Sequence, residues 1–350
     1  MSRILHEDFA RVAQEYDFSA LDGSSVLVTG ATGLLGSQLV RFLLHLSRER
    51  GMEIRPVALV RSEEKAERVF GDDVRDMTLV RGDVLRLPEI PGKIDHVIHG
   101  ASVTSSKDFI SRAVETIDIA VNGTLNVLRL AGEKGVRSLV YLSSMEAFGV
   151  TDGRGEVREE DLGYIDIASP RSSYMESKRM CENLCACFAS EYGLEAKSVR
   201  LAQTLGAGIA YDDTRVAAYF ARCVIEGTDI VLRTEGRTKR PVLYSSDAVS
   251  AILTVMLKGG RGGVYTAANP ATFATIRETA EMVAREIAGG RIGVRYDIQD
   301  TPAEYAPNLN LNLNVDKLRS LGWRPSVGLR DAYGRMIAAM REEKSEGVIL

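Results

Sequence analysis

The chain of 350 residues has few features of a membrane-bound, secreted or nucleic-acid-binding protein. It contains no apolar run near the ~18 residues that a membrane-spanning helix needs. Residues 1–15 carry several charged side chains and lack the apolar segment of a signal peptide. The net charge of −4 gives no reason to expect nucleic acid as a partner. We therefore expect a soluble, cytoplasmic protein that binds neither a membrane nor nucleic acid.

Cysteine is also scarce. The four cysteines are at positions 181, 185, 187 and 223. Three of them fall on one predicted helix, where Cys181 and Cys185 share a face. A metal site would need further ligands nearby, and no histidine lies close to them in the sequence. We predict buried free thiols, without a disulfide and without a metal site.

The stretch 26–36 is the most informative one in the chain. Three apolar residues predict a buried strand, a glycine-rich turn follows, and an amphipathic helix is predicted over 34–45. Gly30 would let the chain turn tightly, Gly33 would let N–H groups approach a pyrophosphate, and Gly36 would let helix and strand pack closely. The helix N-terminus would then face the phosphates. We predict a bound dinucleotide that contacts Gly30, Thr32, Gly33, Leu34 and Leu35.

Strands and helices alternate along most of the chain, which predicts an α/β fold with a Rossmann-like doubly wound parallel sheet. The strands are rich in Val, Ile and Leu, as strands covered on both faces are. The expected strands are 26–28, 54–60, 77–80, 96–99, 138–142, 196–201, 242–244 and 263–266. The expected helices are 4–16, 34–45, 63–69, 109–134, 172–192, 215–226, 275–287 and 329–343.

The carboxyl ends of parallel strands meet at one edge of a sheet, where ligands bind. Asp83 and Val84 follow the third strand, where the carboxylate could accept from the adenine amino group and the valine could pack on the ring. Gly100 and Ala101 follow the fourth strand, and their small size would let the backbone approach the cofactor. These residues should converge with the glycine-rich turn.

The chain is long enough for a nucleotide domain and a smaller lobe. We predict an N-terminal helical arm at 1–23 and a dinucleotide-binding domain at 24–204, with returns near 240–268. A C-terminal substrate-binding lobe would comprise 205–239 and 269–345. Residues 308–314 alternate Asn and Leu, which predicts an extended segment with its leucines on one side.

The residue at the end of the second strand bears on the choice of cofactor. An acidic side chain there would accept hydrogen bonds from the 2′-hydroxyl of NAD and repel a 2′-phosphate. This chain has Arg61, beside Ser62, and a guanidinium would pair with the phosphate of NADP. We favour NADP over NAD, with a solvated Arg61 beside NAD as the alternative.

Tyr174 and Lys178 are four residues apart on a predicted helix, so both side chains leave one face. An ammonium group near the phenol would lower its pKa, and a positively charged nicotinamide would act in the same direction. Such a tyrosine can take a proton from a substrate hydroxyl while hydride leaves the carbon. Ser144, at the end of the fifth strand, could hold the same hydroxyl oxygen.

With these motifs in this order, the sequence resembles the extended short-chain dehydrogenases, the branch of NAD(P)-dependent nucleotide-sugar epimerases, dehydratases and decarboxylases. The matching segments are 29–36, 83–84, 97–101, 123–124, 143–149, Tyr174 with Lys178, 200–206, 240–247 and 321–325. The resemblance implies that Tyr174 is the base and that Lys178 sets its pKa and touches the nicotinamide ribose. It also implies a homodimer formed through helices 109–134 and 172–192.

The resemblance implies further site residues. Glu146 lies where dehydratases and decarboxylases of the family carry a glutamate that assists at C5 or C6, although it could merely hydrogen-bond the turn. The implied substrate contacts are Ser102, Ser144, Gln203, Arg215 and Arg240, of which Arg240 would grip the nucleotide diphosphate and Arg215 could instead be solvated. Met145 replaces the acidic aspartate of the 4,6-dehydratases, which weakens that reading.

The first choice of function is a nucleotide-sugar 4-epimerase, which oxidises C4 to a transient ketone with bound NAD(P). One alternative is a decarboxylase or 4,6-dehydratase, in which Glu146 acts once the ketone has acidified C5. Another is an NADPH-dependent keto-sugar reductase. From a different class, the chain could be a non-catalytic NAD(P)-binding regulator. The base and the sugar stay open.

Overall fold

A computed structural model describes residues 1–151, 155–298 and 310–345. Its central sheet has seven parallel strands in the order β12-β7-β5-β4-β1-β2-β3. The strands are β1 (Ser25–Thr29), β2 (Arg55–Val60), β3 (Thr78–Arg81), β4 (His96–His99), β5 (Ser138–Ser144), β7 (Ala196–Leu201) and β12 (Val264–Ala267). From β1 the chain first adds β2 and β3 on one side and then β4, β5, β7 and β12 on the other, so the strand order reverses between β1 and β4. Ligands bind at such a switch point, and the predicted doubly wound sheet is confirmed.

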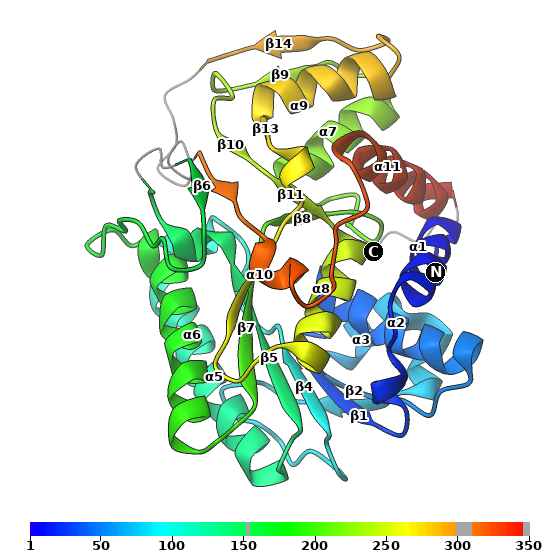
Figure 1. Cartoon of the computed structure of the whole chain (residues 1–350). Helices are drawn as coiled ribbons and strands as arrows, with labels where there is room; N and C mark the ends of the chain where they lie inside the picture. The colour runs from blue at the N-terminus through cyan, green and yellow to red at the C-terminus, as the bar shows by residue number, and fades with distance from the viewer. Residues whose placement is uncertain (152–154, 299–309, 346–350) are drawn as a thin grey trace.

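Helices cover both faces of the sheet (Figure 1). One face carries α2 (Leu34–Arg50) and α8 (Ser245–Lys258), and the other carries α5 (Ala113–Lys134) and α6 (Ser172–Glu191). Successive residues of a strand point to opposite faces. Accordingly, Val26 and Val28 pack in the core under α2 and α8, whereas Leu27 packs in the core under α5 and α6.

A smaller group of elements stands beyond the carboxyl edge of the sheet, at the top of Figure 1. It comprises α7 (Val216–Glu226), β9 (Ile230–Leu232), α9 (Ile276–Met282), a π-helical turn (Val283–Ile287), β14 (Val294–Tyr296) and α11 (Leu329–Ser345). These elements share a hydrophobic core of their own, to which Phe220 and Met336 belong. The predicted helices in this part are confirmed, whereas its assignment to substrate binding stays a prediction.

Short elements join the two parts. Two strands, β8 (Gln203–Leu205) and β11 (Val242–Tyr244), pair in parallel, and β10 (Lys239–Arg240) pairs with β13 (Ala274–Thr275) in antiparallel fashion. Further short α-helices are α3 (Glu63–Phe70), α4 (Asp108–Ser111) and α10 (Asp316–Arg319). In the described part of the chain, no helix is long and apolar enough to cross a membrane.

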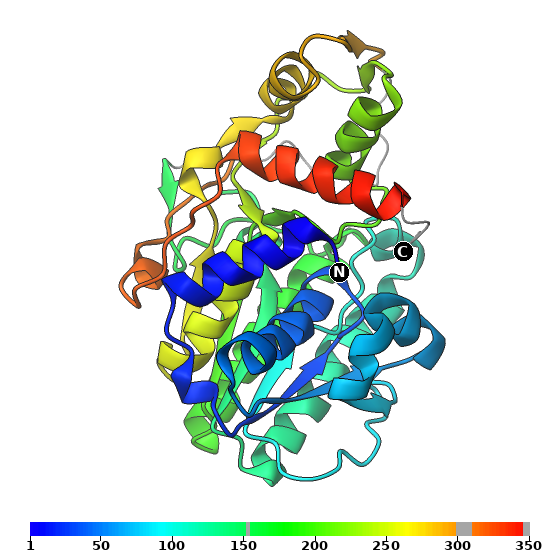
Figure 2. The same ribbon diagram turned by 90° about the vertical axis from the view of Figure 1, so that its right-hand side faces the viewer.

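The N-terminal helix α1 (Arg3–Glu15) crosses the outside of the molecule. Figure 2 shows it beside α11, and it also packs on α2 and α8. Its apolar face is buried, and the ring centre of Phe9 lies 5.4 Å from that of Phe42 on α2. The predicted packing helix is therefore confirmed.

Two helix predictions differ from the structure. The helix predicted over 109–134 is broken, because Arg112 has φ −137° and ψ 46° and separates α4 from α5. The break lets Phe109 of α4 pack against Tyr174 of α6, a tertiary contact that no local pattern announces. Helix α8 was not predicted. Its residues 245–256 are all buried, so it lacks the amphipathic period of a surface helix.

The Asn-Leu run is extended where it is described, over 310–314. Its strand β15 (Asn312–Leu313) pairs in parallel with β6 (Glu156–Val157), and Leu311 and Leu313 are both buried. Leucines on one side of an extended segment are thus confirmed, while residues 308 and 309 lie outside the described residues. Among the cysteines, Cys187 is half-buried rather than buried.

Candidate active site

The glycine-rich turn between β1 and α2 is shaped by close backbone contacts. A Cβ on Gly30, which has φ +69°, would lie 2.8 Å from the backbone of Gly100 and Ala101. A Cβ on Gly36 would lie 2.2 Å from the carbonyl oxygen of Gly30. No side chain caps α2, so the N–H groups of its first turn are open to an anion. This backbone fits a dinucleotide pyrophosphate, and Thr32, Leu34 and Leu35 lie half-buried beside it.

A buried histidine fixes the crevice between β1 and β4. His99 contacts the hydroxyl of Thr29 through Nδ1 at 2.7 Å and that of Thr124 on α5 through Nε2 at 3.1 Å. Burial lowers the pKa of His99 to about 3, so the ring is neutral. The backbone N–H of Ala101 donates to the Thr29 hydroxyl at 3.2 Å. Together these contacts hold Gly100 and Ala101 against β1.

The carboxyl ends of β2 and β3 present two cations. Arg61 and Arg81 are exposed, and the strand register puts Val60 opposite Arg81. Neither guanidinium has a hydrogen bond or an ion pair with any described residue. Asp83 accepts a hydrogen bond from Leu85 N at 2.9 Å, so one of its oxygens is engaged.

Val84 is 5% exposed and packs beneath Gly123 of α5. Its side chain therefore belongs mainly to the core under α5, with little surface left to meet an adenine ring.

Three of the four predicted catalytic residues, Ser144, Tyr174 and Lys178, lie at the end of β5 and near the start of α6. The Ser144 hydroxyl accepts a hydrogen bond from Glu146 N at 3.2 Å and acts to lower the pKa of the Tyr174 phenol, whose ring stacks on Phe109 at 4.2 Å between centres. The Lys178 Nζ atom donates to Leu142 O at 2.8 Å and lies 5.4 Å from the centre of the Tyr174 ring. Phe109 is a contact that sequence reasoning missed.

The pKa of the Tyr174 phenol is shifted in the direction opposite to the prediction. Burial first, and the negative charge of Glu146 second, raise it above its usual range, although Ser144 and Arg171 act in the other direction. Lys178 does not offset this rise, because its ammonium faces a backbone carbonyl and the faces of the tyrosine rings. Burial lowers the pKa of Lys178 itself to about 8. Ionisation of Tyr174 would therefore depend on the positive charge of a bound nicotinamide.

Glu146 forms an ion pair that sequence reasoning missed. Its Oε2 lies 2.9 Å from Nη2 of Arg171, and the two side chains are only 19% and 8% exposed. The Arg171 guanidinium also lies 4.9 Å from the centre of the Phe109 ring. Its Nε and Nη1 atoms are buried without a partner among the described residues. The sequence feature that could have pointed to Arg171 is its spacing, since it precedes Tyr174 by three residues, about one helical turn.

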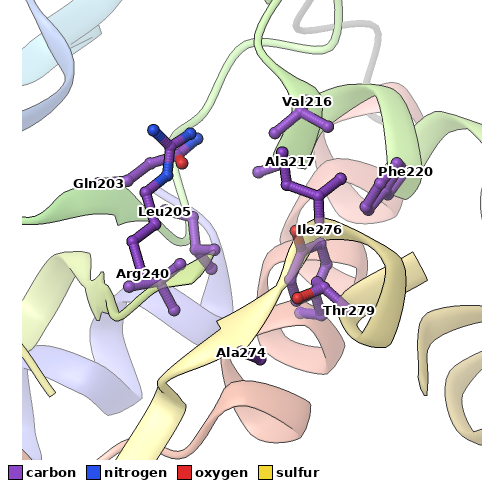
Figure 3. Close-up of a pocket in the computed structure, with 11 residues that line it drawn as sticks. Gln203, Leu205, Val216, Ala217, Phe220, Arg240, Ala274, Ile276 and Thr279 are labelled. Atoms are coloured by element: carbon purple, nitrogen blue, oxygen red, sulfur yellow. The ribbon is translucent and has the colours of Figure 1, made fainter. Parts of the chain in front are cut away.

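A pocket next to this cluster contains Arg240. Figure 3 shows Gln203 and Arg240 on one side and Val216, Ala217, Phe220 and Ile276 on the other. Tyr333 of α11 also lines the pocket. Burial lowers the pKa of Arg240, whereas Glu146 and Tyr333 favour its charged form. Arg240 and Glu146 are thus electrostatically coupled.

Two further predicted substrate contacts have their own hydrogen-bond or ion-pair partners in the structure. The Arg215 guanidinium is 41% exposed and pairs with Asp213, with Nη2 and Oδ2 2.6 Å apart. Ser102 is half-buried, and its hydroxyl donates to Val103 O at 3.2 Å. Arg215 directly precedes Val216, which lines the pocket, and Ser102 directly follows Ala101, so both stay predicted substrate contacts.

A sequence model described as the NAD dependent epimerase/dehydratase family matches residues 26–268. The chain belongs to this family. Family membership classes it as an NAD-dependent enzyme, and the matched segment contains the glycine-rich turn, Ser144, Tyr174 and Lys178.

Proteins of similar sequence and solved structures of similar fold support this family assignment. The chain is 27% identical over 331 residues to UDP-glucuronic acid decarboxylase 1 of Xenopus tropicalis, covering 93% of this chain and 74% of that protein. It is 29% identical over 314 residues to UDP-glucuronic acid decarboxylase 3 of Arabidopsis thaliana, covering 89% and 87%.

Among solved structures, the epimerase Mth375 of Methanothermobacter thermautotrophicus has a TM-score of 0.77 at 21% identity, covering 98% of this chain and 97% of that one. The dTDP-glucose 4,6-dehydratase of Bacillus anthracis, in complex with NAD, has a TM-score of 0.74 at 17% identity, covering 93% and 100%. At these identities the structures establish the fold.

Proposed function

We propose that the chain is a nucleotide-sugar decarboxylase that oxidises the sugar at C4 and releases the C6 carboxylate as carbon dioxide. The observation that carries this proposal is the buried pair of Glu146 and Arg171 beside Tyr174. A simple 4-epimerase needs no such pair. The relatives named UDP-glucuronic acid decarboxylase support the same choice, which replaces 4-epimerisation as the first candidate.

In this proposal each residue has one task at the sugar. Tyr174 takes the proton from the C4 hydroxyl, which Ser144 orients. The nicotinamide, when bound, accepts the hydride and later returns it. The resulting C4 ketone lies β to the carboxylate, so the C5–C6 bond can break with its electron pair moving toward the ketone. Arg171, held by Glu146, offers its two unpaired nitrogens to that carboxylate.

A proton from solvent then adds to C5 and completes the loss of carbon dioxide, while Glu146 stays ionised and holds Arg171. Returned hydride reduces the ketone, so the cofactor is regenerated and the reaction needs no external reductant. A 4-epimerase remains the second candidate, because Ser144, Tyr174 and Lys178 suffice for it. The reductase and the non-catalytic regulator remain alternatives that the experiment below separates.

For the rest of the substrate, we propose that the Arg240 pocket holds the nucleotide diphosphate, with Gln203 beside it. The surrounding elements at 205–239 and 269–345 would then form the substrate-binding lobe. Support comes from the pocket's mixture of a half-buried guanidinium and apolar walls, which suits a charged diphosphate attached to a flat base.

We also propose NADP as the preferred cofactor. Arg61 and Arg81 end neighbouring strands and have no hydrogen-bond or ion-pair partner in the described ranges, so both are free to meet a 2′-phosphate. The family is described as NAD dependent and the Bacillus anthracis dehydratase holds NAD, so a preference for NADP would set this chain apart from them.

A homodimer is proposed through α5 and α6. These helices pack side by side on the outside of the molecule (Figure 1), and they expose Val114, Ile117 and Met180 by 76%, 46% and 50%. Exposed apolar side chains that gather on adjacent helices favour a protein partner. The cytoplasmic location stays a prediction from the sequence.

The proposal is tested by incubating the protein with UDP-glucuronic acid and either NAD or NADP. We expect release of carbon dioxide and a pentose product, with no net change of the cofactor. A 4-epimerase would retain the carboxylate. A reductase would consume NADPH with a keto-sugar, and a regulator would bind ligand without any turnover.

A further inference from the structure

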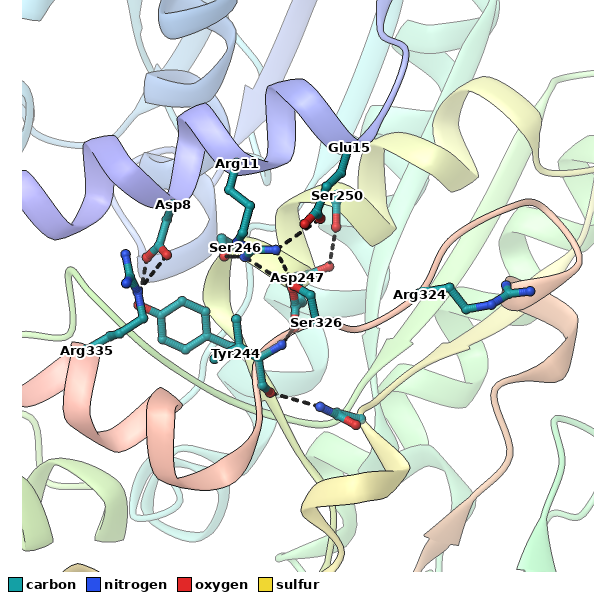
Figure 4. A network of polar contacts seen from close by, with 12 residues as sticks. Asp8, Arg11, Glu15, Tyr244, Ser246, Asp247, Ser250, Arg324, Ser326 and Arg335 are labelled. Atoms are coloured by element: carbon teal, nitrogen blue, oxygen red, sulfur yellow. Dashed lines mark hydrogen bonds and ion pairs between the residues drawn. The ribbon is translucent and has the colours of Figure 1, made fainter. Parts of the chain in front are cut away.

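One buried carboxylate on the N-terminal helix contacts both elements that flank the Arg240 pocket. Asp8 is 1% exposed. Its Oδ2 accepts a hydrogen bond from the Tyr244 hydroxyl of β11 at 2.7 Å, and its Oδ1 accepts one from Nε of Arg335 on α11 at 2.9 Å (Figure 4). We name these three side chains the arm clasp.

Both donors of the arm clasp stand close in sequence to residues that line the pocket. Tyr244 ends β11, four residues after Arg240, and β11 pairs with β8 so that Val242 lies opposite Gln203. Arg335 follows Tyr333 by two residues, a spacing that turns their side chains to different sides of α11. Tyr333 therefore lines the pocket while Arg335 meets the arm.

The arm that carries Asp8 is itself fixed to the sheet. Phe9 and Phe42 pack edge to face, which ties α1 to α2. On the other side, Nη2 of Arg11 donates to the Ser246 hydroxyl of α8 at 2.8 Å, and Nη1 donates to the Ser326 hydroxyl.

The chain segment that leads into α11 is fixed as well. The Asp247 carboxylate accepts hydrogen bonds from the N–H groups of Ser326 and Val327, both at 3.0 Å. Thus α11 is held at its start by α8 and again at Arg335 by the arm.

Removal of water from Asp8 and Tyr244 costs free energy, so the arm clasp contributes little to the stability of the fold. Its hydrogen bonds are directional, however, so they define the spacing of the elements that they join. An apolar contact at the same place would tolerate sliding of α11 along β11.

We propose that Asp8 is a positioning residue for the nucleotide pocket, because it holds Tyr333 on α11 opposite Arg240 on the strand that precedes β11. This inference rests on the proposed function, since it takes the Arg240 pocket as the site of the nucleoside diphosphate. Asp8 acts through Tyr244 and Arg335 and touches no ligand itself.

Calorimetric titration with UDP and with NADP tests the inference. Asp8→Asn and the milder Tyr244→Phe each weaken the arm clasp, and we expect the UDP dissociation constant to rise by about fivefold or more. The NADP dissociation constant should stay within about twofold, because the glycine-rich turn does not depend on α11. Gln14→Ala, on the exposed face of α1, is the matched control and should leave both constants unchanged.

A double variant separates positioning from stability. Asp8→Asn alone leaves Arg335 its ion pair with Glu7 at 3.2 Å, whereas Asp8→Asn with Arg335→Gln replaces both charges of the arm clasp by neutral amides. UDP binding should remain weak in the double variant at any melting temperature, and recovery of UDP binding there would overturn the inference. So would Asp8→Asn and Tyr244→Phe variants that melt earlier yet bind UDP as the wild type does. A wild-type protein that binds none of UDP, CDP, GDP and dTDP would instead overturn the proposed function.

Discussion

The two halves of the active site are built in different ways. The cofactor half, around β1 and the start of α2, depends on backbone geometry, and its key positions are glycines within one short segment. The substrate half depends on charged side chains, Glu146, Arg171 and Arg240, which come from three separate segments. Under the proposed function, the first half binds the dinucleotide, whereas the second would decide which reaction follows the first hydride transfer.

The largest expected effect lies where the two halves meet. Tyr174→Phe removes the proton acceptor, so kcat should fall by about 10²- to 10⁴-fold. The cofactor half should be untouched, and titration should give an unchanged NADP affinity. Tyr164→Phe, at a side chain 67% exposed, is the control. Turnover that survives Tyr174→Phe would remove the phenol from the mechanism.

A substitution in the cofactor half should mainly lower the stability of the fold. Gly36→Ala would push a Cβ to 2.2 Å from Gly30 O, and we expect a loss of about 1–3 kcal/mol in the free energy of unfolding. NADP binding should weaken with it. Gly132→Ala, in α5, meets no atom within 4 Å and should be neutral or stabilising. Chemical denaturation of both variants measures the difference, and equal stabilities would contradict the backbone account.

A change in the substrate half should act on chemistry. Glu146→Gln keeps the shape but removes the charge that holds Arg171, so decarboxylation should slow by about tenfold or more. The affinity for NADP should not change. Rates of carbon dioxide release compare this variant with Glu159→Gln, a carboxylate that accepts from Thr266 N away from the pair. Equal rates for Glu146→Gln and the wild type would show that the pair of Glu146 and Arg171 has no part in catalysis.

Cofactor choice is expected to depend on side chains even within the cofactor half. Arg61→Ala should weaken NADP by about tenfold, the loss of one charge-assisted contact to phosphate, and leave NAD nearly unchanged. The ratio of the two dissociation constants is the measurement, with Arg75→Ala, an 82% exposed side chain, as the control. An unchanged ratio would mean that Arg61 is merely solvated.

The smallest expected effect concerns Lys178, whose pKa is lowered to about 8 by burial. Between that pH and the ordinary lysine pKa, the unfolded chain binds more protons than the folded one, so stability rises with pH. The wild type should therefore gain about 1 kcal/mol or more between pH 7 and pH 10 relative to Lys178→Met. Denaturation at the two pH values measures this gain. The same change of stability with pH in the wild type and in Lys178→Met would contradict the burial of a titrating amine.

The difference between the halves also explains what the sequence could reveal. Gly30 and Gly36 face constraints from their own turn and from β4, so their spacing predicts a dinucleotide site. The meeting of Ser144 and Tyr174 followed from the parallel sheet, which brings strand ends to one edge. Local pattern and topology sufficed for these contacts.

Arg171 and Phe109 could not be found in this way. The pairing of Arg171 with Glu146 depends on the loop before α6, and the stacking of Phe109 depends on the break at Arg112. The pKa of Tyr174 was predicted in the wrong direction because spacing gave the distance of Lys178 but not the direction of its ammonium. These contacts and directions are set by tertiary packing, which a local sequence pattern does not reveal.

The most direct test of the central claim is turnover of UDP-glucuronic acid in deuterium oxide, followed by nuclear magnetic resonance of the sugar product. Decarboxylation through a C4 ketone predicts a pentose with one solvent deuterium at C5 and the original hydrogen at C4. A hexuronic acid product that keeps its carboxylate, inverts C4 and takes up no deuterium would contradict the account and establish an epimerase.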